Sequence, residues 1–159
     1  MEKRSFQSAS PMDMLKSLVL ADTERSIRIS LHPRETYSEV EMAALLSLIE
    51  SERRLKLVST IPSLLLQRCA YVVTQNSSLA LNGFFFQKPA ILFSKIDFHH
   101  IAQNVCDIGV KTAFENVREN NPAFNAFIYW FFQKQSINAG RENAGNKILK
   151  TVRQHGWNL

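Results

Sequence analysis

The chain has few cysteines and no long hydrophobic run. Only two of its 159 residues are cysteine, Cys69 and Cys106, and they lack any metal-ligand spacing. Because free cysteine is usually buried, we expect both to be reduced core residues. The apolar run at 126–132 is far shorter than the ~20 residues that a membrane-spanning helix needs. No apolar segment follows the charged first residues, so we expect no secretory signal and a cytoplasmic protein.

Two nucleotide-binding signatures are also absent. The sequence contains neither GxGxxG nor GxxxxGK[ST], which argues against a dinucleotide-dependent enzyme and against a P-loop NTPase. It also shows no pair of acidic residues typical of a metal site, and no internal repeat. We therefore expect no metal and no cofactor.

The positive charge is concentrated near the C-terminus. The chain has a net charge of +5, and residues 134–159 hold five basic residues and one acidic residue. This segment is either a solvated helix face or a contact surface for acidic lipid headgroups, an anionic glycan or nucleic acid. Nucleic acid fits least well, because the segment has no aromatic stacking platform and no recognised motif. We expect no nucleic-acid partner, and we keep peripheral contact with an inner membrane as an alternative to the solvated face.

Strand and helix patterns alternate along the first 93 residues. Apolar spacing predicts helices at 10–22, 38–51, 62–68 and 78–87, and alternating or buried runs predict strands at 26–31, 55–58, 71–74 and 90–93. Such alternation with short links is typical of a parallel sheet covered by helices on both faces. The sequence therefore predicts an α/β fold with a Rossmann-like sheet.

The pattern changes after residue 93. A loop or short helix is expected at 97–101, and helices at 110–119, 121–137 and 142–155. The second of these helices is apolar nearly all round, so it should be buried on most sides. The last is amphipathic, with Ile148, Leu149 and Val152 facing inward. We expect a nucleotide-binding core at 1–110 and a helical extension at 111–159, packed on the core or on a further domain.

Polar residues follow two of the predicted strands. The turn at 74–78 places small hydroxyl side chains and unpaired backbone N–H groups at the start of a helix, where phosphate binds favourably. His32, Pro33 and Arg34 close an earlier strand. Because ligands collect at the carboxyl ends of parallel strands, both segments should face one crevice.

Each of these residues also has a structural alternative. His32 can simply end a strand, Ser77 and Ser78 are favoured N-cap residues, and Arg34 can be a solvated charge. The segment with Asp97, His99 and His100 is either plain loop structure, a nucleotide contact or, least favoured, a metal site, since adjacent histidines rarely point the same way.

Several motifs together resemble one protein family. They are His32-Pro33, Asn76-Ser77-Ser78, Gly83, Lys88-Pro89, and Phe93 followed by Asp97-Phe98-His99-His100. In this order they resemble the C-terminal half of capsular polysaccharide biosynthesis proteins, which are GT-B-type glycosyltransferases that include the bacterial β-Kdo transferases. A looser similarity links them to bacterial sialyltransferases, which carry an HP motif and a Ser-Ser/Thr motif. The resemblance covers roughly residues 5–105.

The resemblance implies a nucleotide-sugar substrate, commonly CMP-activated. By position, His32 would contact the phosphate or donate a proton, and Pro33, Asn76, Ser77 and Ser78 would complete the phosphate site. Further nucleotide or substrate contacts are implied for Arg34, Gln75, Asp97, His99 and His100. Phosphate release from a CMP-sugar needs hydrogen-bond donors rather than a metal.

The resemblance also implies parts that we do not find here. Its longer members have an N-terminal domain with the acceptor site and the carboxylate base, and a central strand ahead of the helix at 10–22. We therefore expect a glycan acceptor and an N-terminal-domain partner chain, and an incomplete or split enzyme that is inactive alone. The alternatives are a non-catalytic α/β remnant or interaction module, and a sugar-nucleotide epimerase-like domain.

Overall fold

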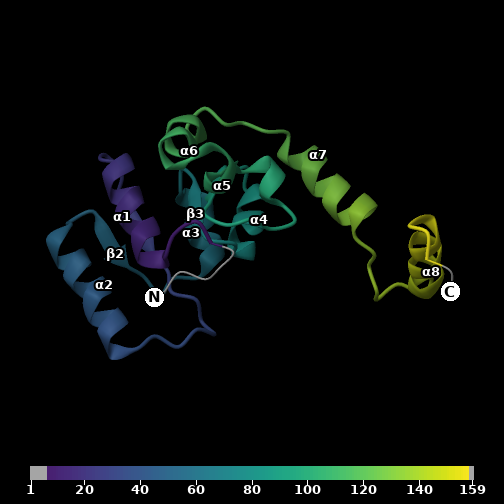
Figure 1. Cartoon of the computed structure of the whole chain (residues 1–159), viewed down its shortest axis with the longest axis horizontal. Helices are drawn as coiled ribbons and strands as arrows, with labels where there is room; N and C mark the ends of the chain where they lie inside the picture. The colour runs from purple at the N-terminus through teal and green to yellow at the C-terminus, as the bar shows by residue number, and fades with distance from the viewer. Residues whose placement is uncertain (1–6, 158–159) are drawn as a thin grey trace. The chain divides into compact units, whose positions relative to one another are not determined.

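The computed structural model describes residues 7–157, which form two compact units, Met1–Pro122 and Ala123–Leu159. The first unit holds all the strands that the structure describes and most of the helices (Figure 1). In chain order its elements are α1 (Pro11–Ala21), β1 (Ile27–Ile29), α2 (Glu39–Ser51), β2 (Leu55–Leu57), α3 (Pro62–Arg68), β3 (Val72–Thr74), α4 (Ser78–Phe84), β4 (Ala90–Leu92), the 3₁₀ turn η1 (His99–Ile101), β5 (Gln103–Asn104), α5 (Val105–Ile108) and α6 (Val110–Val117).

Local capping chemistry explains where the first two long helices begin. The Ser10 hydroxyl accepts a hydrogen bond from the Asp13 N–H at 3.1 Å, and Pro11 occupies the first helical position of α1. Before α2, the Ser38 and Glu41 side chains each accept from the other's backbone N–H, which is a capping box. These sequence signals therefore placed both helix starts correctly.

The five strands that the structure describes form two parallel sheets rather than one. β1 pairs with β2, with Ile27 opposite Leu55, and the second sheet has the order β3–β4–β5. The predicted α/β class with parallel strands is thus confirmed, and the arrangement is consistent with a Rossmann-like fold. β5 and α5 were not predicted, because two strand residues followed by a four-residue helix carry too little periodicity to recognise.

Helix α1 holds the two sheets together. Leu15 of α1 is buried with Ile27, Leu45 and Leu55 in the core around β1 and β2, while Leu18 packs against that core and also against the core around β4 and α6. In Figure 1, α1 (purple) accordingly lies between α2 and β2 on one side and β3 and α6 on the other.

The direction of α1 shows which strand ends lie together. At its start, the carbonyl of Ala9 accepts a hydrogen bond from the side chain of Gln75, just after β3. At its end, the carboxylate of Asp22 accepts one from the hydroxyl of Tyr71, just before β3. α1 therefore runs antiparallel to β3. It also runs antiparallel to β1, to which a short turn joins it, so the carboxyl ends of β1 and β3 lie at the same end of this unit.

Helix α6 belongs to the first unit. Ala113, Phe114 and Val117 are buried in the same cluster as Ile91 and Phe93 of the sheet region. The structure thus places α6 in the first unit and divides the chain after Pro122.

The second unit contains α7 (Phe124–Tyr129), which continues as the π-helix η2 (Trp130–Gln135), and α8 (Ala144–Gln154). The second unit does not cover the helix at 121–137 by itself, because Tyr129, Trp130 and Phe132 are 59%, 42% and 41% exposed. That the core or a further domain covers it stays a prediction. A unit of this size has too little chain to cover a helix that is apolar all round.

Two other sequence expectations can be checked here. Cys69 is half-buried, but Cys106 is exposed, so the prediction that both are core residues is wrong for Cys106. It lies in the short helix α5, and its Sγ contacts the Phe93 carbonyl at 3.8 Å. No helix within 7–157 has the length and apolar character needed to cross a bilayer.

Candidate functional site

His32 lies in the exposed loop that follows β1. Its backbone N–H donates to the Tyr37 hydroxyl at 3.1 Å, and its Nδ1 accepts from the Arg34 N–H at 3.2 Å. When Nδ1 accepts, a neutral imidazole carries its proton on Nε2. Pro33 and Arg34 are exposed beside it. The Nε2–H is therefore the donor that this exposed ring presents in its neutral form.

The turn between β3 and α4 contains the second set of predicted residues. The Ser77 hydroxyl is the N-cap of α4 and accepts from the Leu79 N–H at 3.2 Å, while Ser78 is exposed at the first helical position. This confirms the structural alternative that the sequence predicts for Ser77, an N-cap residue. Because the Ser77 hydroxyl acts as an acceptor in this bond, its proton can still be donated. Asn76 beside it is half-buried.

Gln75 is the buried member of this turn, with 8% of its surface exposed. Its Nε2 donates to the Ala9 carbonyl at 3.1 Å, but its Oε1 is a buried acceptor without a partner among the described atoms. A buried polar atom without a partner is destabilising, so it is a natural position for a hydrogen bond from another molecule or segment.

The turn and the His32 loop lie at the same end of the first unit, as the strand directions require. Within the described residues no hydrogen bond joins His32 or Arg34 to Ser77 or Ser78. The structure thus brings the two segments to one end, and each keeps its own local hydrogen bonds.

The third predicted segment follows β4. The rings of His99 and His100 lie 3.9 Å apart, the Nδ1 of His99 contacts the Ile96 carbonyl, and Asp97 is exposed. Within 7–157, no three His, Cys, Asp or Glu side chains gather as a metal site requires. His99 is therefore committed to its own turn, and the exposed His100 and Asp97 are better placed for a ligand.

Gly83 has a packing role in this region. A Cβ added there would lie 3.2 Å from the Val72 side chain, so a larger residue would require that side chain to move by a few tenths of an ångström where α4 approaches β3. A shallow hollow of about 200 Å³ lies along the same helix, between Leu66 of α3, Asn82 of α4 and Phe85 at the C-cap of α4. This hollow is at the C-terminal end of α4, away from Ser77, so it does not form part of the predicted phosphate site.

The sequence did not reveal the best-defined polar cluster, which surrounds Asp22. This carboxylate is 1% exposed and accepts from the Tyr71 hydroxyl at 2.6 Å. It also lies 3.0 Å from the Arg25 guanidinium and 3.7 Å from that of Arg118. Arg54 donates to the Asp22 backbone carbonyl. The sequence gives no signal for this cluster, because its members come from four separate segments.

The electrostatics of the Asp22 cluster are those of a structural ion pair. Burial acts to raise the pKa of Asp22, but hydrogen bonds from Tyr71, Arg25 and the backbone outweigh burial and lower that pKa to about 2. Burial and the contact with Asp22 raise the pKa of Tyr71 above its ordinary value. The cluster lies at the amino ends of β1 and β3, opposite the predicted ligand end, so we assign it to stability.

Comparisons of the chain with protein-family models, with curated proteins and with solved structures found no match.

Proposed function

We propose that the first unit binds the nucleotide of a CMP-activated sugar and is the donor-binding part of a capsule-type glycosyltransferase. One observation carries the proposal: α1 runs antiparallel to both β1 and β3, which puts the His32 loop and the Ser77–Ser78 turn at the same end of the unit. Carboxyl ends of parallel strands are where α/β proteins bind nucleotides.

The residues at this end suit a phosphate that gains charge. In glycosyl transfer from a CMP-sugar, the bond between the anomeric carbon and the phosphate oxygen breaks, and CMP leaves with an added negative charge. The His32 Nε2–H and the hydroxyls of Ser77 and Ser78 can donate to that phosphate. The unpartnered Oε1 of Gln75 can accept from an amino or hydroxyl group of the nucleotide. The acceptor hydroxyl would pass its proton to a carboxylate base on a partner domain, as the family resemblance implies.

The split sheet supports the need for a partner. β1 pairs only with β2, and β3 only with β4, among the described residues, so each strand has one edge without a partner strand. The two open edges belong to β1 and β3, which run in the same direction. Helix α1 packs against the apolar cores of both sheets. A parallel strand supplied by another segment or another chain would fit between them and complete one sheet.

Titration calorimetry with CMP tests the binding proposal. We expect the full chain to bind CMP, and we expect both His32→Ala and the double variant Ser77→Ala/Ser78→Ala to weaken that binding roughly 10-fold or more through lost charge-assisted hydrogen bonds. His155→Ala and Ser47→Ala are matched controls, because both residues are exposed and lie on other elements. CMP affinity that is equal in all of these variants would exclude this site.

The same titration separates the other candidates. An interaction module with this fold is favoured by the unpaired strand edges, and it would bind no nucleotide. A sugar-nucleotide epimerase-like domain would prefer UDP to CMP. CMP preference that depends on His32 supports only the transferase proposal.

A further inference from the structure

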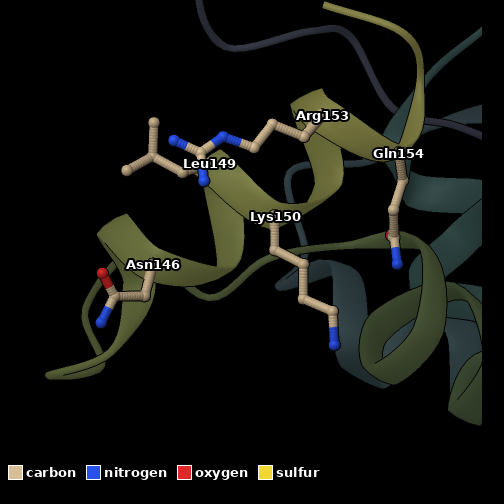
Figure 2. A pocket seen from close by; sticks show the side chains of 5 residues that line it. All are labelled: Asn146, Leu149, Lys150, Arg153 and Gln154. Atoms are coloured by element: carbon tan, nitrogen blue, oxygen red, sulfur yellow. The ribbon is translucent and has the colours of Figure 1, made fainter. Parts of the chain in front are cut away.

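Helix α8 separates its side chains into an apolar face and a cationic face. Ala144, Ile148 and Val152 recur every four residues, with Leu149 at the border of the same face. The opposite face carries the three cations Lys147, Lys150 and Arg153. Figure 2 shows Lys150, Arg153 and their neighbours Asn146, Leu149 and Gln154, which line one side of this helix along a surface hollow.

Within the second unit, the apolar side of α8 is only partly covered. Ile148 and Leu149 are 43% and 41% exposed, although we expected them to face inward, and Val152 is half-buried. The prediction that α8 is amphipathic is confirmed. The second unit, however, provides no further element that buries this face.

The end of α8 brings a tryptophan back toward that apolar face. Gly156 has φ +84°, its N–H donates to the Arg153 carbonyl at 3.0 Å, and the Trp157 N–H donates to the Val152 carbonyl at 3.2 Å. These two bonds form a Schellman motif, in which the residue after the glycine returns toward the last apolar turn. Trp157 is 67% exposed, so its indole is available at this end of the helix.

The cations of α8 have no acidic partner within the described residues. They form most of the basic excess of residues 134–159, where Glu142 is the single acid. A cationic face next to an exposed apolar face with a terminal tryptophan is typical of helices that lie in the interface of an anionic bilayer. Duplex nucleic acid would use the cations but would leave Ile148, Leu149 and Trp157 exposed to water.

We propose that α8 and Trp157 form a binding surface for anionic lipid membranes, with Lys147, Lys150 and Arg153 contacting headgroups and Ile148, Leu149 and Trp157 entering the interface. This inference is independent of nucleotide binding. It predicts which parts of the surface approach the lipid, and each part can be altered separately.

Vesicle flotation with the full chain tests the proposal. We expect binding to vesicles of mixed phosphatidylglycerol and phosphatidylcholine, little binding to phosphatidylcholine alone, and a loss of binding as salt is raised. The triple variant Lys147→Gln/Lys150→Gln/Arg153→Gln should weaken binding on the order of 100-fold, from the usual contribution of a cation at an anionic surface. The control Arg28→Gln/Lys56→Gln/Arg68→Gln removes the same charge from exposed positions of the first unit and should bind normally.

Tryptophan fluorescence locates the contact. The chain has two tryptophans, so Trp130→Phe leaves Trp157 as the single reporter. Its emission should shift to the blue with the mixed vesicles, and Ile148→Ser/Leu149→Ser should reduce binding while circular dichroism confirms that the helix content is kept. The proposal is overturned by unshifted emission, by equal binding to neutral vesicles, by a control variant as weak as the α8 variant, or by tighter binding to a DNA duplex than to the vesicles.

Discussion

Among single residues, the buried carboxylate of Asp22 gives rise to the strongest prediction. The pKa of Asp22 is lowered to about 2 from its ordinary value of 3.8, so its ionised form stabilises the folded protein at any pH above 3.8, and that contribution is lost as the pH falls towards 2. We expect Asp22→Asn to lower the free energy of unfolding near neutral pH by about 2 kcal/mol. The variant should also lose less stability than the parent chain when the pH falls to about 3.

Urea unfolding at the two pH values measures this effect. Glu119→Gln is a suitable control, because this exposed carboxylate has no described ion pair. If Asp22→Asn were as stable as the parent at neutral pH, the hydrogen bonds and ion pairs around Asp22 would contribute nothing net, as can happen for buried ion pairs.

At the scale of elements, two glycines of the α8 region should respond to the same substitution in opposite ways. Gly156 adopts a positive φ, so Gly156→Ala should weaken the end of α8 by about 1 kcal/mol. Gly145 lies within the helix with nothing within 4 Å of an added Cβ, so Gly145→Ala should strengthen α8 by about 0.5–1 kcal/mol.

Far-UV circular dichroism and hydrogen exchange of the Gly156 and Trp157 amides report these changes. Faster exchange of both amides in Gly156→Ala, and unchanged or slower exchange in Gly145→Ala, is the expected pair of results. The same direction of change in both variants would contradict the Schellman ending.

The elements also show what the sequence can and cannot predict. The helix at Pro62–Arg68 and the strand cores around Ile27, Leu55 and Ile91 were predicted because proline, capping residues and apolar spacing are local signals. α4 is shorter than predicted, since a turn that includes Gln87 at φ 58° ends it before Lys88. The helix at 121–137 begins at Phe124 instead of beside Pro122, and its N-cap residue Ala123 makes no side-chain capping hydrogen bond.

Predictions about the site depend on information that is not local. The motifs correctly indicated loops after β1, β3 and β4, because strand ends carry turn residues. The Asp22 cluster and the orphan acceptor of Gln75 could not be foreseen, since both depend on contacts between segments that are far apart in the sequence.

For the whole molecule, the unpaired strand edges make a testable prediction. The N–H groups of Ile27 and Val72 donate to the neighbouring strands, so in a parallel ladder the N–H groups of Arg28 and Val73 point to the open edges. We expect the Arg28 and Val73 amides to exchange hydrogen much faster than the Ile27 and Val72 amides, as measured by NMR.

A partner strand between β1 and β3 would reverse this pattern. Addition of a protein that completes the sheet should slow exchange at Arg28 and Val73 selectively. Slow exchange at both amides in a dilute, monomeric sample would mean that the edges are already paired, and the proposed strand position would then be wrong.

The carboxylate described above has one more consequence. Tyr71 lies just before β3 in one sheet, and Arg25 and Arg54 lie just before β1 and β2 in the other sheet. Because Asp22 contacts all three residues, it connects the two sheets. Neither half can come apart without breaking the same set of bonds. The two small sheets should therefore melt together in one cooperative transition, although no ladder hydrogen bond joins them.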